Sequence, residues 1–126
     1  MIKPDINLSI AEQKTALNVC FKIMFEWDIS EANQRDLLGK PDSVVFKQWQ
    51  EKDVRGSLQQ DVLLRASCII KIYKHLHIIF PSKQQANDWI LKPNSMFNQQ
   101  TALKVIISEE IAGLQKIESY LKSQLI

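Results

Sequence analysis

The stretch between residues 72 and 94 constrains the fold of this chain more than any other part of the sequence. An apolar run with helical spacing ends at Phe80-Pro81, a second short segment carries Trp89, and Pro93-Asn94 follows four residues later. Proline has no backbone N–H and clashes with the preceding turn, so a helix that reaches Pro93 ends there. General hydrophobic patterning does not require this arrangement, and we therefore interpret it as a specific signature.

Apolar residues recur at spacings of three and four along most of the chain, which predicts an all-α fold. The expected helices are Ser9 to Trp27, a short one from Ser30 to Leu38 closed by Gly39, one from Asp42 or Ser43 through Trp49, the longest from about Ser57 to Phe80, one from Ser82 to Pro93, one from Thr101 to Ile107, and a last one from Ser108. Ser57 and Ser82 each precede a glutamine by three residues, which predicts a capping box at both sites. We expect a loop from Asn94 to Gln100 and no strand.

A length of 126 residues is sufficient for one self-sustaining domain. The net charge of +2 is too small to argue for nucleic acid by itself, so the distribution of charge has to be considered. Cys20 and Cys68 lie inside apolar helical patterns and are expected to be buried free thiols. The sequence has no signal-like N-terminus and no apolar run of membrane-spanning length, which predicts a soluble, cytoplasmic protein without a membrane partner.

Catalytic and metal-binding motifs are missing from the sequence. His75 and His77 are two residues apart, which places them on different sides of a helix and prevents them from holding one metal ion. The patterns HExxH, GxSxG, GxGxxG and the P-loop do not occur. We therefore expect a protein that is not an enzyme and that uses no metal or other cofactor.

Two separate parts of the chain resemble one protein family. The first resembles the Xre-like helix-turn-helix region of the Xre/MbcA/ParS antitoxins, through Trp27-Asp28-Ile29-Ser30, Leu37-Leu38-Gly39, Pro41, Ser43 and Trp49. The second resembles the toxin-binding domain of the same family, through Ile72-Tyr73-Lys74, Leu76-His77, Phe80-Pro81, Ala86, Trp89, Pro93-Asn94, Phe97, Ala102-Leu103, Gly113-Leu114, Ile117 and Tyr120-Leu121. The second resemblance is the more specific, because helix-turn-helix patterns often arise by chance.

The resemblance implies a compact multi-helix bundle with a helix-turn-helix region at residues 9–68 and a toxin-binding and dimerisation region at residues 69–126. It also implies an antitoxin of a type II toxin–antitoxin system. Such a protein neutralises a RES-type, NAD-consuming toxin by direct binding and represses its own operon as an oligomer. The expected partners are therefore a cognate RES-like toxin, operator DNA and a second copy of the chain.

The chain departs from the family pattern in two places. Family members commonly have Arg near the start of the recognition helix, where this chain reads Asp42-Ser43-Val44-Val45. This difference weakens the expected contacts to phosphate and guanine. The family's Gly-rich turn is replaced by Phe97-Asn98-Gln99-Gln100, in which Asn98 can adopt a left-handed conformation.

The expected recognition helix presents polar and basic side chains that suit contacts to DNA. The candidates are Ser43, Val44, Lys47 and Gln48 toward the major groove, with Lys40 and Lys52 toward phosphates. An ordinary solvated helix is the alternative interpretation of the same residues. Because Asp42, Glu51 and Asp53 repel phosphate, a monomer should bind weakly and a two-fold dimer is expected.

The C-terminal helix ends in apolar residues, whereas chain ends are usually polar. We expect the partner-binding residues to be Ile117, Tyr120, Leu121, Gln124, Leu125 and Ile126. The alternative is that they pack onto their own globule or onto a sister subunit. Trp89, Pro93 and Asn94 are expected to be structural: Trp89 as a wedge between helices, Pro93 as a helix stop, and Asn94 through bonds to local backbone.

Two further readings of function stay open at this stage. The chain could be a helix-turn-helix transcriptional regulator whose C-terminal half only dimerises. It could also be a protein-binding module whose helix-turn-helix has lost its affinity for DNA, which the missing Arg residues would allow.

Overall fold

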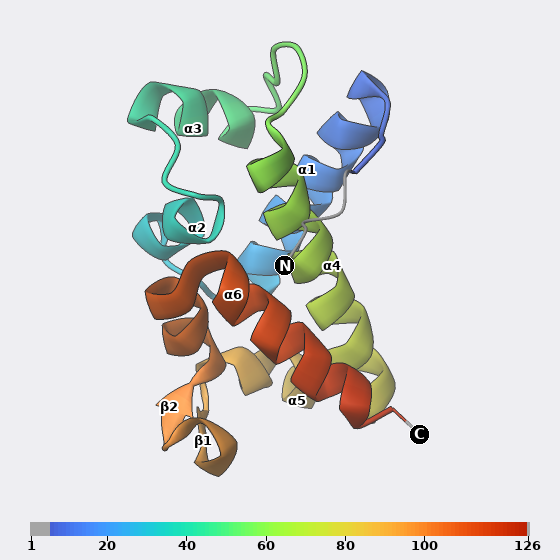
Figure 1. The fold of residues 1–126 in the computed structure, drawn as a ribbon, viewed down its shortest axis with the longest axis vertical. Coiled ribbons are helices and arrows are strands. Elements are labelled where there is room, and N and C mark those ends of the chain that lie inside the picture. Colours follow the sequence, from blue (N-terminus) through green and yellow to red (C-terminus); the bar gives the residue numbers. More distant parts are fainter. Residues whose placement is uncertain (1–5, 126) are drawn as a thin grey trace.

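Six α-helices follow one another along residues 6–125, the part of the chain that this computed structural model describes (Figure 1). They are α1 (Ile10–Glu26), α2 (Glu31–Leu37), α3 (Ser43–Gln50), α4 (Gln60–Ile79), α5 (Lys83–Asp88) and α6 (Ala102–Ser123). Two single turns of 3-10 helix, η1 (Trp89–Leu91) and η2 (Ser95–Phe97), and two short strands, β1 (Pro93–Asn94) and β2 (Gln100–Thr101), lie between α5 and α6. The predicted all-α bundle is confirmed.

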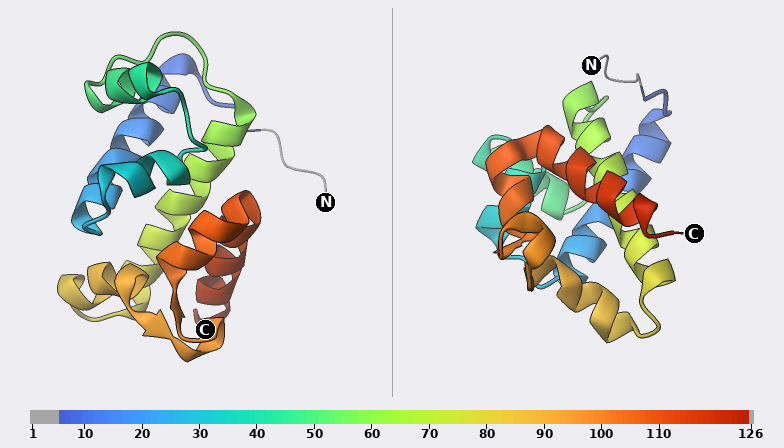
Figure 2. Two further views of the ribbon diagram at one scale, coloured as in Figure 1. Left: turned by 90° about the vertical axis from the view of Figure 1, so that its left-hand side faces the viewer. Right: turned by 60° about the horizontal axis from the view of Figure 1, so that its bottom comes forward.

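Helix α4 is the element to which both halves of the molecule attach. It packs against α1 on one side and against α5 and α6 on the other. Figure 2 shows α1, α2 and α3 gathered toward one end of α4, with α5, the strands and α6 toward the other. Cys20 of α1, Ile69 of α4 and Leu114 of α6 are all fully buried in one continuous apolar core. The two halves therefore form one folded body.

Side-chain caps fix the starts of the three N-terminal helices. Ser9 and Glu12 form a reciprocal capping box before α1, and Ser30 Oγ accepts a bond from the Asn33 N–H before α2. Asp42 Oδ1 accepts from the Val44 N–H at 2.8 Å before α3. These bonds satisfy N–H groups that have no partner inside the helix. The predicted positions of these helices are confirmed to within a residue or two.

The predicted capping box at Ser57 is wrong, because α4 begins only at Gln60 and its N-cap, Gln59, makes no side-chain bond. The Ser57 hydroxyl instead donates to Oε1 of Gln13, which also accepts from the Leu58 N–H at 2.7 Å. Gln13 is a buried polar side chain of α1, and it must find partners in the segment that crosses it. Because Ser57 and Leu58 bond to Gln13, they lie before α4 rather than in it.

The predicted loop from Asn94 to Gln100 is partly wrong, because Pro93 pairs with Thr101 and Asn94 with Gln100 in a minimal antiparallel ladder. Asn98 and Gln99 both have left-handed backbone, with φ of 56° and 66°, and these two residues reverse the chain between the strands. The left-handed Asn98 was predicted and is confirmed. The strand pair was missed because it depends on two consecutive left-handed residues, of which only one was foreseen.

The segment around Trp89 also differs in detail from the prediction. The predicted capping box at Ser82 is only half formed: Ser82 Oγ accepts from the Gln85 N–H, but the Gln85 side chain does not bond back to the Ser82 N–H. The α-helix then ends at Asp88, and Trp89 begins the 3-10 turn η1 rather than lying inside the helix. Pro93 follows this turn as the first residue of β1.

Helix α6 is kinked at Glu110, whose φ of 58° and ψ of −128° interrupt the helix. A break in this region was predicted at Ser108, but the Ser108 hydroxyl donates to Lys104 and Val105 carbonyls and so belongs to the first limb. The second limb crosses the first closely. A Cβ on Gly113 would lie 2.7 Å from the Val105 carbonyl oxygen, so only glycine fits there.

Candidate DNA-binding and partner-binding surfaces

The turn between α2 and α3 is held by backbone conformation and by one arginine. Gly39 and Lys40 have φ of 93° and 58°, which turn the chain sharply after α2. Arg35 Nε donates to the Pro41 carbonyl oxygen at 2.6 Å, across the turn. Leu37 and Leu38 are fully buried beneath it, so the direction of α3 is fixed by packing as well as by hydrogen bonds.

Helix α3 buries one side and exposes the other. Phe46 and Trp49 pack into the core, with 6% and 8% of their surface exposed. The opposite side carries Ser43, Val44, Lys47, Gln48 and Glu51, which line one shallow hollow and which we call the α3 face. Four of the six predicted DNA-binding residues therefore lie together. Val44 is 64% exposed, although it is apolar.

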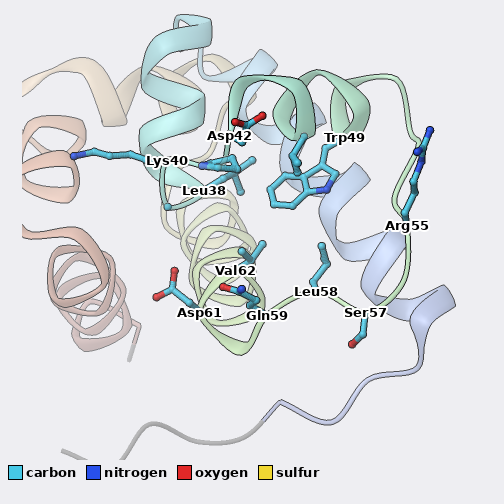
Figure 3. Close-up of a pocket in the computed structure, with 13 residues that line it drawn as sticks. Leu38, Lys40, Asp42, Trp49, Arg55, Ser57, Leu58, Gln59, Asp61 and Val62 are labelled. Atoms are coloured by element: carbon cyan, nitrogen blue, oxygen red, sulfur yellow. The ribbon is translucent and has the colours of Figure 1, made fainter.

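The other two predicted DNA-binding residues, Lys40 and Lys52, are exposed at the two ends of α3 rather than on its face. Figure 3 shows the Lys40 side chain extending away from a pocket of about 400 Å³ on the buried side of α3. Leu38, Trp49 and Leu58 contribute to the lining of that pocket. Acidic groups stand near the same helix, and Asp53 forms an ion pair with Arg55 at 3.0 Å. The face thus carries charges of both signs.

The C-terminal half contains a cluster of three aromatic rings. Trp89 lies nearly parallel to Tyr120, with ring centroids 6.3 Å apart and 13° between the planes. Phe97 meets both rings edge-on, at 6.1 Å from Trp89 and 5.3 Å from Tyr120. Phe97 is buried, whereas the other two are half-buried. Trp89 thus joins η1 to α6, and Asn94 Oδ1 accepts from the Met96 N–H at 2.9 Å, which is the local bond expected of Asn94.

The six residues predicted to bind a partner occupy very different environments. Ile117 and Leu121 are 0% and 2% exposed and belong to the chain's own core. Tyr120 and Leu125 are half-buried, Gln124 is exposed, and Ile126 lies outside the described residues. Only Tyr120, Gln124 and Leu125 among those described can therefore reach another molecule without a change in the fold.

Residues 75–124 match the family described as the antitoxin Xre/MbcA/ParS C-terminal toxin-binding domain. The C-terminal region of the chain belongs to the Xre/MbcA/ParS antitoxin family. The matched region runs from the C-terminal end of α4 through α6, so it contains the aromatic cluster and the kink at Glu110. Membership of this family indicates an antitoxin that acts in a toxin–antitoxin pair.

A relative of this antitoxin is the uncharacterized protein y4oB of Sinorhizobium fredii, which is 33% identical over 108 residues. The similarity covers 86% of this chain and 82% of the relative. No solved structure matches the chain.

In the antitoxin, one buried arginine pairs with two partly exposed carboxylates where the two halves meet. Arg65 of α4 is only 6% exposed and contacts Asp61 Oδ2 at 3.0 Å and Glu110 Oε1 at 3.6 Å. A Cβ on Gly39 would lie 3.0 Å from the Asp61 carboxylate, so the turn before α3 lies directly against this cluster. Arg65 therefore lies between the α2–α3 turn and the kink at Glu110.

A second polar cluster joins the end of α1 to α4 and α5. Glu26 Oε1 contacts Lys83 Nζ at 2.9 Å, and the Lys83 bond chiefly lowers the pKa of Glu26. Hydrogen bonding to the Glu26 carboxylate raises the pKa of Tyr73 to about 12. Tyr73 in turn lies against His77, with ring centroids 4.1 Å apart. Nothing in the sequence spacing indicated this cluster, because its members come from three helices.

Outside these two clusters, the histidines and cysteines of residues 6–125 do not come together in one site. Within residues 6–125, no three His, Cys, Asp or Glu side chains are placed to hold a metal ion. His75 contacts Glu118 and His77 contacts Asn87, so the two histidines have different partners. Cys20 and Cys68 are buried free thiols, as predicted, and burial raises the pKa of both. No helix in the described region is long and apolar enough to span a membrane.

Two exposed apolar residues of the toxin-binding half were missed from the sequence. Leu91 is 40% exposed and Met96 is 65% exposed. Leu91 follows Trp89 by two residues and Met96 directly precedes Phe97, in the turn that was predicted as a loop. The helical periodicity used to find partner residues could not indicate them, because neither lies in an α-helix.

Proposed function

We propose that this chain is the antitoxin of a type II toxin–antitoxin system and neutralises a RES-type, NAD-consuming toxin by binding to it directly. The match of residues 75–124 to a toxin-binding domain supports this proposal most strongly. Residues 69–126 would form the toxin-binding and dimerisation region, and residues 9–68 the helix-turn-helix region. In this role the protein is not an enzyme, needs no cofactor and acts in the cytoplasm.

Neutralisation requires a stable contact that covers the toxin's active site. Interfaces of this kind gain most of their affinity from a few apolar or aromatic anchors surrounded by polar groups. Tyr120, Gln124 and Leu125 offer such a surface at the end of α6. Ile117 and Leu121 would contribute indirectly, since they fix the orientation of the helix that carries Tyr120.

Expression in bacteria tests the toxin proposal. The RES-like protein encoded beside this chain's gene should arrest growth when expressed alone, and co-expression with the antitoxin should restore growth. The two proteins should also elute together in size-exclusion chromatography. If growth arrest persists and the proteins elute separately, this chain does not neutralise that protein.

A second function, repression of its own operon as a homodimer, is favoured by the exposed α3 face. Side chains near the start of a recognition helix contact base edges, and Ser43, Val44, Lys47 and Gln48 are available for such contacts. Lys40 and Lys52 at the ends of α3 would meet phosphates. Because Asp42 and Glu51 oppose phosphate, two copies that bind two half-sites would be needed for useful affinity.

Gel-shift measurements on DNA from upstream of the operon test this second function. Lys47→Ala should weaken binding and reduce the dependence on salt by about one unit in log–log slope. Lys74→Ala is the matched control, because Lys74 is an exposed lysine of α4 away from the α3 face. Binding that responds equally to both substitutions would remove the α3 face from the DNA site.

The rival function is a transcriptional regulator whose C-terminal half only dimerises. A homodimer that binds DNA with high affinity but has no effect on the adjacent toxin would support the rival. The antitoxin proposal requires the opposite result in the growth assay.

A further inference from the structure

Four exposed or half-buried apolar or aromatic side chains stand on η1, η2 and α6, three elements that are joined by the contacts of Phe97 with Trp89 and Tyr120. We call Trp89, Leu91, Met96 and Tyr120 the aromatic knuckle. Trp89 and Tyr120 stack on each other and are half-buried, while Leu91 and Met96 are 40% and 65% exposed. Only six large apolar side chains among the described residues are exposed to this degree, so these two are unusual for the molecule.

Hydrogen bonds in the turn between β1 and β2 fix the backbone that carries Met96 of the aromatic knuckle. Asn94 Oδ1 accepts from the Met96 N–H at 2.9 Å, and the Gln99 N–H donates to the Asn94 carbonyl oxygen at 2.9 Å. The ladder between β1 and β2 closes the turn, and buried Phe97 fixes it to Trp89 and Tyr120. A surface that is already ordered loses little conformational entropy when a partner binds.

The chemistry of the knuckle is that of an interface rather than of a solvated turn. Tryptophan, tyrosine and methionine are enriched at the centres of protein interfaces, and charged residues are depleted there. Methionine also adapts its shape to a partner surface. Replacement of the exposed Met96 by a polar residue would cost the monomer little, so such a variant probes binding without disturbing the fold.

We infer that the aromatic knuckle is the anchor by which this antitoxin holds its toxin. The inference rests on the proposed toxin-binding function and assigns it to particular residues. All four knuckle residues lie inside residues 75–124, the part of the chain that matches a toxin-binding domain, which favours the toxin over a second copy. Tyr120 also shares a face of α6 with exposed Gln124, one turn further on, so the knuckle is continuous with the accessible end of that helix.

The charges beside the knuckle define the kind of surface that it fits. Lys92 is exposed directly after Leu91, and exposed Lys116 stands one helical turn before Tyr120, where it also contacts Glu109 at 3.6 Å. An apolar pocket with an acidic rim on the toxin would complement this arrangement. The apolar anchors would supply most of the affinity, and the lysines would affect the rate of association.

Binding of the full-length antitoxin to the RES-like protein encoded beside its gene tests the inference. Met96→Lys should weaken the complex roughly tenfold or more, as truncation of an interface anchor does. Leu91→Lys should weaken it less, because Leu91 is less exposed. Ile78→Lys is the matched control: Ile78 is 68% exposed, lies in the same matched region and sits on α4, and its replacement should leave affinity unchanged. Circular dichroism should show equal helicity for all three variants.

The possible results separate the inference from the function on which it rests. If the wild-type chain neither binds the toxin nor restores growth, the proposed function fails and the inference fails with it. If the wild-type chain binds but Met96→Lys binds equally well, the toxin uses another surface. If light scattering shows that Met96→Lys converts a dimer to a monomer while toxin binding persists, the knuckle is an interface between copies, which also overturns the inference.

Discussion

The α3 face and the aromatic knuckle are surfaces of opposite construction within one small bundle. The α3 face is a polar strip on a regular helix whose start is fixed by one cap, Asp42. The knuckle is an apolar surface on irregular backbone, and it depends on buried Phe97 and on the position of α6. A polar strip can therefore change its side chains without consequence for the fold, whereas the knuckle is tied to the core behind it.

The largest expected effect comes from a charge placed in the core that supports the knuckle. Ile117 is 0% exposed, so Ile117→Asp should unfold the chain or lower its stability by about 3–5 kcal/mol or more. Chemical denaturation followed by circular dichroism measures this loss. Gln124→Asp places the same charge on the exposed end of α6 and should change stability by about 0.5 kcal/mol or less. Equal effects at the two positions would contradict the burial of Ile117.

The kink in α6 gives the next largest effect, because it sets the direction of the limb that carries Tyr120. A Cβ at position 113 would lie 2.7 Å from the Val105 carbonyl oxygen and 2.9 Å from Ile106 Cα, both backbone atoms that cannot move freely. Gly113→Ala should therefore destabilise the fold by about 1–3 kcal/mol. Ala112→Ser, at the exposed neighbouring position, is the control for thermal denaturation. A Gly113→Ala variant as stable as the wild type would show that the two limbs are not this close.

The α3 face was predictable from the sequence, whereas the knuckle was not. The exposed side of α3 follows from local rules: Asp42 caps, Phe46 and Trp49 turn inward, and the residues between them must face out. The order of the helices and the limits of α1, α2 and α3 were recovered in the same way, whereas α4 begins later and α5 ends earlier than predicted, and α6 joins two predicted helices. The local rules failed at Ser57, where a contact between distant residues decides the structure. The Ser57 hydroxyl, which was expected to cap α4, donates to buried Gln13 instead.

Helical periodicity alone could not locate the partner-binding surface. Ile117 and Leu121 were predicted to bind the partner, with packing onto their own globule as the alternative, and both lie in the core of the chain. Glu110 adopts its left-handed φ next to buried Arg65 of α4, a contact between residues far apart in sequence. The knuckle likewise depends on a strand ladder of two residue pairs, which is too short to produce an alternating pattern.

A smaller effect is expected from the interaction of the Tyr73 hydroxyl with the Glu26 carboxylate. The folded state raises the pKa of Tyr73 from its ordinary value of 10 to about 12, so the folded state retains the phenol proton longer than the unfolded chain. The contribution to stability is fully present below pH 10 and is lost as the pH rises toward 12. Tyr73→Phe removes it.

The difference in melting temperature between the wild type and Tyr73→Phe should therefore be largest at neutral pH and shrink between pH 10 and about 12. Thermal denaturation over that range measures it. A difference that stays constant with pH would mean that the hydroxyl makes no titrating bond and that Phe differs from Tyr only in packing.

The smallest change, at Asp42, separates the two roles of a single side chain on the α3 surface. Asp42 stabilises α3 by accepting from the Val44 N–H, yet its charge opposes DNA phosphates at the start of the helix. Asparagine caps about as well as aspartate, so Asp42→Asn should leave stability nearly unchanged and strengthen DNA binding severalfold at low salt. Asp42→Ala loses the cap and should cost about 1 kcal/mol of stability. If Asp42→Asn fails to raise affinity in a gel shift while the wild type binds, DNA does not approach the start of α3 and contacts another part of the molecule.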